Sequence, residues 1–132
     1  MARTLGVVIV VLAVVDGLIH LGLNIFVVHG ITNRPPVSDL FFLNFLGYMV
    51  LAGAFLVLRS GSLSNRRLID IVLIVYPLLA LAAWIYFTKG RGNPFGLADI
   101  SKPAEVILAL AALVHLTQLG KEEAPGLMQS RA

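Results

Sequence analysis

The sequence predicts an all-α fold, a four-helix transmembrane bundle with antiparallel up-down-up-down helices and short loops. The chain is 58% hydrophobic and 13% charged, with a mean hydropathy of +0.92, whereas a soluble domain is usually about 25% charged. No alternating strand pattern is present, and backbone groups in lipid must pair within their own segment. Four apolar runs each come near the roughly 20 residues that a helix needs to cross a bilayer, namely 5–29, 40–58, 68–87 and 103–119.

We expect one transmembrane domain at 1–120 and a polar C-terminal tail at 121–132. The first helix ends at Gly30, and Ser38 or Asp39 is placed to cap the second. The link between the second and third runs is so short that these helices form an antiparallel hairpin.

The later elements carry ordinary membrane-helix signals. A proline after Tyr76 is expected to kink the third helix. The aromatic residues near the end of that helix fit an interfacial belt. Pro103, preceded by Ser101, is a typical start for the fourth helix.

The charges favour a membrane orientation over nucleic-acid binding, because the cations are spread over loops and ends. The net charge is +3. With four spans, both termini lie on one side of the bilayer, and that side carries six cations against four on the other. The tight 59–67 link is the clearest positive segment, so we expect both termini in the cytoplasm of a multi-pass protein of the cell membrane.

Three polar side chains interrupt the most apolar part of the chain, in the stretch VVDGLIHLGLN. Asp16, His20 and Asn24 recur at helical spacing and share a stripe with small residues. Small residues let helices approach closely, and polar ones bond across the contact. Because a charged aspartate at mid-bilayer costs a few kcal/mol, Asp16 is expected to have a partner or to be protonated.

Counting inward from the helix ends suggests which partner Asp16 meets. Asp16 lies thirteen residues from His29, and His115 lies thirteen from Lys102, so both are about 20 Å deep. We therefore expect Asp16 and His115 to meet. A heptad-like stripe is also expected to turn Glu105 and His115 to one face of the fourth helix.

Two polar layers follow from these depths. The outer layer holds Asn24, Asn44 and Glu105, and the deeper one holds Asp16, His20, Tyr48, Tyr76 and His115. One interpretation is that these groups bond one another and fix helix register, at about 0.6 kcal/mol per contact. The other is a buried site for a quinone, a lipid headgroup or a proton in transit.

Resident cofactors and metals find little support in the sequence. Haem could be held by two histidines on facing helices, but His20 and His115 differ in depth by about 6 Å, which strains an axial pair. With no cysteine and no HExxH motif, we expect no metal site. No nucleotide-binding loop or nucleophile motif indicates an enzyme, and we assign no catalytic residue.

Three stretches carry a family resemblance: LFFLNFLGYMVLAGAFLVL, RRLIDIVLIVYPLLALAAWIYF and GNPFGLADISKPAEVILALAALVHL. They resemble an uncharacterised family of small four-helix prokaryotic integral membrane proteins, with LNxxGY, RRL and GNPxG followed by KxxE as its pattern. The resemblance covers roughly residues 40–116 and implies no activity. It places six residues on motif positions: Asn44, Gly47, Tyr48, Tyr76, Lys102 and Glu105.

Two functions fit a chain of this kind. The first is a non-enzymatic accessory, assembly or scaffolding subunit of a membrane complex, or a homo-oligomer, because the loops are too short to form a further domain. The second is a binding or transport protein with an intramembrane polar site between its helices.

Overall fold

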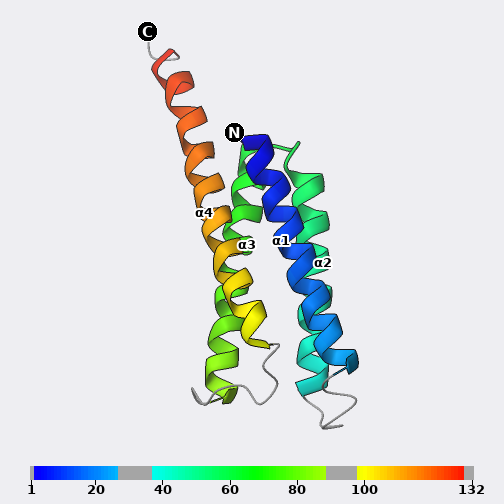
Figure 1. Cartoon of the computed structure of the whole chain (residues 1–132). Helices are drawn as coiled ribbons and strands as arrows, with labels where there is room; N and C mark the ends of the chain where they lie inside the picture. The colour runs from blue at the N-terminus through cyan, green and yellow to red at the C-terminus, as the bar shows by residue number, and fades with distance from the viewer. Residues whose placement is uncertain (1, 27–36, 89–97, 130–132) are drawn as a thin grey trace.

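Four helices and no strand make up the described part of a computed structural model, which covers residues 2–26, 37–88 and 98–129, with side chains at 4–26, 39–86 and 101–121. The helices are α1 (Ala2–Gly22), α2 (Val37–Leu58), α3 (Leu63–Thr88) and α4 (Ala98–Gln129). The predicted all-α, four-helix fold is confirmed (Figure 1).

Each helix packs against two neighbours. α1 contacts α2 and α4, and α3 contacts α2 and α4, so the four helices form a closed bundle. α1 begins and α4 ends at the same end of the bundle, where α4 projects beyond the other helices (Figure 1). Segments long and apolar enough to cross a membrane occur in all four: Thr4–Phe26, Asp39–Leu58, Leu63–Tyr86 and Ser101–Lys121.

The observed helix ends differ from the predicted ones where polar residues join a helix. α3 begins at Leu63, before the two arginines, and the Asn65 amide donates to Ser62 Oγ at 3.4 Å as an N-terminal cap. α4 runs on to Gln129, through most of the expected tail, whose Lys-Glu-Glu-Ala start favours helix. Hydropathy locates the long apolar part of a helix and not its polar extensions.

Two start signals are also corrected, and one helix end is irregular. Because α2 begins at Val37, Ser38 and Asp39 lie in its first turn and neither is the residue before it. Likewise, α4 begins at Ala98, so Ser101 lies inside it. α1 continues as a π-helical turn over 23–26, and the rest of its predicted length lies outside the described residues.

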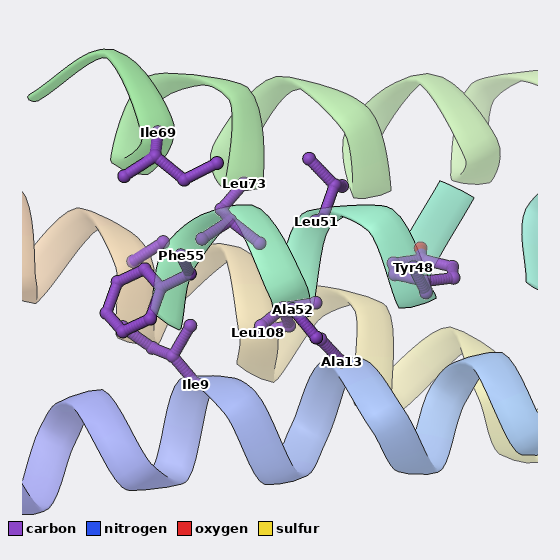
Figure 2. Close-up of a cluster of buried hydrophobic side chains, with 10 residues drawn as sticks. Ile9, Ala13, Tyr48, Leu51, Ala52, Phe55, Ile69, Leu73 and Leu108 are labelled. Carbon is purple, nitrogen blue, oxygen red and sulfur yellow. The ribbon is translucent and has the colours of Figure 1, made fainter. Parts of the chain in front are cut away.

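The core lies between the helices, and the outward faces are apolar. Buried side chains from all four helices form one cluster around Tyr48, Phe55 and Leu108 (Figure 2). Large apolar side chains such as Phe26, Val50 and Val57 are 77%, 67% and 72% exposed. An apolar surface of this kind on four long helices is compatible with a multi-pass membrane protein.

α1 and α2 touch along the stripe of small residues, as predicted. A Cβ at Gly17 would lie 2.6 Å from Met49 Cε and 3.2 Å from Tyr48 Cβ. Because even a methyl group at this position would be tightly packed against α2, Gly17 brings the two helices close enough for the neighbouring polar residues of α1 to contact α2 and α4.

Candidate functional site

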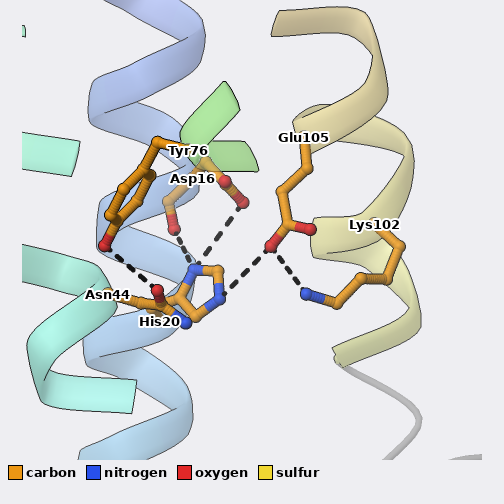
Figure 3. Close-up of polar contacts among 6 residues, drawn as sticks. All are labelled: Asp16, His20, Asn44, Tyr76, Lys102 and Glu105. Atoms are coloured by element: carbon orange, nitrogen blue, oxygen red, sulfur yellow. Dashed lines mark hydrogen bonds and ion pairs between the residues drawn. The ribbon is translucent and has the colours of Figure 1, made fainter. Parts of the chain in front are cut away.

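Two carboxylates and one imidazole meet between α1 and α4, and we call Asp16, His20 and Glu105 the α1–α4 centre. One ligand atom of each residue lies within 4.8 Å of the others. Asp16 and His20 are fully buried, and Glu105 is 1% exposed. Figure 3 shows the three side chains pointing toward one another from the two helices.

Helical spacing fixes the orientation of the His20 ring. Asp16 and His20 are four residues apart, so they lie one above the other on the same face of α1. His20 Nδ1 donates to the Asp16 backbone carbonyl at 2.9 Å. A carbonyl oxygen only accepts, so Nδ1 carries a proton, and in the neutral ring Nε2 therefore carries a free lone pair.

Glu105 approaches His20 from the first turns of α4. Glu105 Oε1 lies 3.6 Å from His20 Nε2, which is beyond hydrogen-bond length. The same oxygen accepts from Lys102 Nζ at 2.6 Å, one turn earlier on α4. Lys102 Nζ also lies 6.0 Å from the centroid of the Trp84 ring on α3.

Aromatic rings from α2 and α3 wall the centre. The His20 ring lies 5.9 Å from Phe41 and 5.7 Å from Tyr48. Tyr48 in turn meets Tyr76 edge-to-face at 5.1 Å, and the Tyr76 hydroxyl donates to Asn44 Oδ1 at 3.1 Å. These contacts exclude water from one side of the imidazole.

The LNxxGY motif has a structural explanation in this wall. Asn44 accepts the Tyr76 hydrogen bond, and Tyr48 covers His20. A Cβ at Gly47 would overlap the Tyr76 hydroxyl, so only glycine admits the tyrosine of α3. The three motif residues therefore serve one contact between α2 and α3, next to the centre.

Five buried polar atoms at the centre have no hydrogen-bond partner: both carboxylate oxygens of Asp16, His20 Nε2, the Tyr48 hydroxyl and Glu105 Oε2. The Tyr48 hydroxyl is the only donor among them, and it faces the Asp16 carboxylate. Buried polar groups are nearly always bonded, and an unpaired one is costly. The centre therefore has more acceptors than its own residues satisfy.

His115 belongs to a second polar contact, the α3–α4 pair of Asp70 and His115. His115 Nδ1 lies 2.7 Å from Asp70 Oδ2, and Phe55 meets the His115 ring at 5.5 Å. The predicted meeting of Asp16 with His115 is therefore wrong. Glu105 and His115 are ten residues apart, which turns them about 80° from each other around α4, so one faces α1 and the other α3.

The two predicted layers do not exist as such. Glu105, assigned to the outer layer, contacts His20 of the deeper one, and Asn44 and Tyr76 bond across the same division. Asn24 is buried one turn beyond His20 on α1. Seven of the eight predicted site residues therefore lie in or beside one region, and His115 lies apart from them.

An apolar layer separates the centre from the pair. Leu108 and Ala112 lie between Glu105 and His115 on α4, over about 15 Å of helix. Ile9 and Ala13 of α1 pack in the same cluster (Figure 2). His20 and His115 thus contact different acids on either side of this layer and do not face a common haem site.

Sequence reasoning missed Asp70, although a signal for it was present. An ionisable residue within an apolar span is expected to have a partner or a function, and Asp70 lies in the RRLID stretch of the third run. The expectation of no metal site stays a prediction, and the centre brings one nitrogen and two carboxylate oxygens within 4.8 Å of one another.

The comparisons with known proteins give a family and no activity. No curated protein and no solved structure matches the chain. A family of unknown function (DUF7475) matches residues 1–116. The match includes α1, with Asp16 and His20, which lies outside the resemblance noted above. The chain therefore belongs to this family of unknown function.

Proposed function

We propose that the protein is a membrane-embedded binding protein whose α1–α4 centre holds a small cation. The observation that carries the proposal is the set of buried acceptors without partners, contributed by Asp16, His20 and Glu105. The acceptors His20 Nε2 and Glu105 Oε1 face each other across 3.6 Å and repel each other. A cation bound between them would remove the repulsion.

The excess of acceptors also disfavours two other ligands that the sequence left open, a quinone and a lipid headgroup. A quinone presents carbonyl oxygens, and a lipid phosphate presents anionic oxygens, so both need donors. The centre offers mostly acceptors, with Lys102 already engaged by Glu105 (Figure 3). Ligand atoms within 4.8 Å of one another also suit a single ion better than a ring.

The position of the centre favours binding over a continuous channel. Glu105 lies four residues, about 6 Å of helix, from the start of its apolar span. Beyond Asp16, the fully buried Ile9, Ala13 and Leu108 form an apolar barrier. We propose that the ion enters from the face at which α1 ends and α4 begins, which is the outer face if both termini lie in the cytoplasm of a prokaryotic cell.

The accessory-subunit role remains compatible with this proposal. A small cation-binding helix bundle can act alone or within a larger membrane complex. A scaffolding role by itself, however, gives no reason for five unsatisfied buried atoms in one place, because polar contacts that only fix helix register would satisfy one another.

Thermal unfolding in mild detergent tests the proposal. The chelator-treated protein is measured with single chloride salts of Na⁺, K⁺, Mg²⁺, Ca²⁺, Mn²⁺ and Zn²⁺. A ligand that binds only the folded state raises the melting temperature, so at least one salt should stabilise the wild type, and Asp16→Asn with Glu105→Gln should abolish the shift. Asp39→Asn, an exposed carboxylate at the same end of the bundle, is the matched control and should keep it.

Either of two results would reject cation binding at this centre. One is that no salt stabilises the wild type beyond a general ionic-strength effect. The other is that the specific shift persists in the double variant, which would place the bound ion elsewhere on the protein.

A further inference from the structure

We propose that the bound cation is a divalent first-row transition-metal ion whose three protein ligands are Asp16, His20 and Glu105. The inference rests on the proposed cation-binding function and names the ion class for the same site. It depends on the spacing of the ligand atoms, the orientation of His20, the donor types and the charge of the centre.

The spacing fits a metal ion better than a shared proton. Metal–nitrogen and metal–oxygen bonds of about 2.0–2.2 Å in a tetrahedral site put two ligand atoms about 3.4 Å apart. His20 Nε2 and Glu105 Oε1 are 3.6 Å apart, Asp16 Oδ1 lies 3.7 Å from the other ring nitrogen, and one ligand atom from each of the three residues lies within 4.8 Å of the others. A proton shared between nitrogen and oxygen would bring them to about 2.7–3.0 Å.

His20 is already held as a metal ligand would be. Metal-binding histidines almost always donate their other ring N–H to a carbonyl or carboxylate, which fixes the ring and aims the lone pair. His20 Nδ1 donates to the Asp16 carbonyl, while Nε2 faces Glu105 without a partner. The rings of Phe41 and Tyr48 hold this orientation.

The donor types select among divalent ions. Mg²⁺ and Ca²⁺ prefer all-oxygen surroundings, whereas imidazole suits the later first-row ions. No thiolate is present in the chain, so one nitrogen and two carboxylates form the set. Three protein ligands leave one coordination position open, and the buried Tyr48 hydroxyl lies beside the centre without a hydrogen-bond partner.

The charge of the centre favours a doubly charged ion. Two carboxylates, one neutral imidazole and a divalent cation sum to zero, and a neutral cluster is the least costly to bury in a bilayer. Lys102, which neutralises Glu105 when the ion is absent, then carries a surplus charge. We expect its ammonium to leave Glu105 for the face of Trp84, 6.0 Å away.

Cobalt spectroscopy of the purified, metal-free protein tests the assignment. Co²⁺ should give visible d–d bands at one ion per chain. Zn²⁺ should displace it stoichiometrically, and excess Mg²⁺ or Ca²⁺ should not. Asp16→Asn, His20→Gln and Glu105→Gln should each lose the bands, while His115→Gln, the matched buried histidine, should retain them.

Lys102→Met gives a test with the opposite sign. Removing the competing ammonium should tighten Co²⁺ binding about tenfold, which corresponds to about 1.4 kcal/mol, because a like charge next to the ion opposes its binding. If Lys102 only stabilised the fold, its removal would instead weaken Co²⁺ binding, because the fold and the site would be weakened together. Weaker binding in Lys102→Met, or bands that survive His20→Gln, would overturn the ligand assignment.

The two proposals fail in distinguishable ways. If Na⁺ or Ca²⁺ stabilises the protein through Asp16 and Glu105 while Co²⁺ gives no bands, the transition-metal inference is wrong and the cation-binding function stands. If no cation binds the centre by either measurement, both are wrong.

Discussion

The two buried histidines of this bundle make opposite use of the same chemistry. In the α3–α4 pair, His115 Nδ1 meets Asp70 Oδ2 at 2.7 Å, and only Asp70 Oδ1 lacks a partner. In the α1–α4 centre, the His20 N–H is used within its own helix, and the lone pair of Nε2 faces a carboxylate at 3.6 Å. The pair forms a direct contact between its two side chains, whereas the centre holds several buried polar atoms without a hydrogen-bond partner.

The difference follows from which groups each histidine meets. His20 Nδ1 bonds the carbonyl of Asp16, four residues earlier on the same helix, so only Nε2 can point toward α4. His115 Nδ1 instead crosses to α3 and meets an acceptor there. The Nδ1 contact of His115 therefore joins two helices, whereas that of His20 stays within α1 and its buried Nε2 has no hydrogen-bond partner.

The largest effect on stability should come from breaking the α3–α4 pair. His115→Ala leaves the Asp70 carboxylate buried without its donor, and such losses cost about 3 kcal/mol. Equilibrium unfolding in mixed detergent micelles measures this free energy. Thr117→Ala, an exposed change on the same helix whose hydroxyl bonds only its own backbone, should cost far less. Equal costs for the two variants would mean that the pair does not stabilise the fold.

The wall of the centre should tolerate little added volume. Gly47→Ala places a methyl group where the Tyr76 hydroxyl lies, and overpacking of this kind costs about 1–3 kcal/mol. Gly53→Ala is the matched control, because it lies on the same helix with open space around it and should not destabilise the protein. If both alanines behave alike, the contact between α2 and α3 is loose and Tyr76 is not fixed by it.

The sequence predicts what depends on one helix and fails where two helices must be placed together. Hydropathy located the four apolar spans, and counting residues inward from the helix ends gave the depth of each polar side chain. Depth alone does not say which way a side chain faces. Equal depth therefore predicts a contact between Asp16 and His115, whereas the α4 residue beside Asp16 is Glu105. The turn of about 80° between Glu105 and His115 could have been calculated from their spacing. That Asp70 is the partner of His115, however, depends on where α3 packs, and spacing along one helix does not give this.

Neutralising Asp16 should have a smaller effect, in the opposite direction. Without metal, both Asp16 carboxylate oxygens are buried without a hydrogen-bond partner, and the His20 Nδ1 donor lies 3.7 Å from Oδ1. Asp16→Asn removes this buried carboxylate and should stabilise the apo protein by about 1 kcal/mol. Asp70→Asn, which weakens a bonded carboxylate, should destabilise it. The comparison is measured by unfolding in the presence of a chelator. A loss of stability in Asp16→Asn equal to that in Asp70→Asn would show that the centre satisfies its own charges.

The smallest effect should come from the hydrogen bond behind the centre. Tyr76→Phe removes the hydroxyl that donates to Asn44 while keeping the ring against Tyr48, and such bonds contribute about 0.6 kcal/mol in membrane proteins. A double-mutant cycle with Asn44→Ala isolates the pairwise part. Because neither residue is a proposed ligand, Co²⁺ affinity should stay within the error of the titration. If Tyr76→Phe weakens ion binding more than it lowers the free energy of unfolding, the contact between α2 and α3 helps to position the ligands. The α1–α4 centre then extends through Tyr48 into α3.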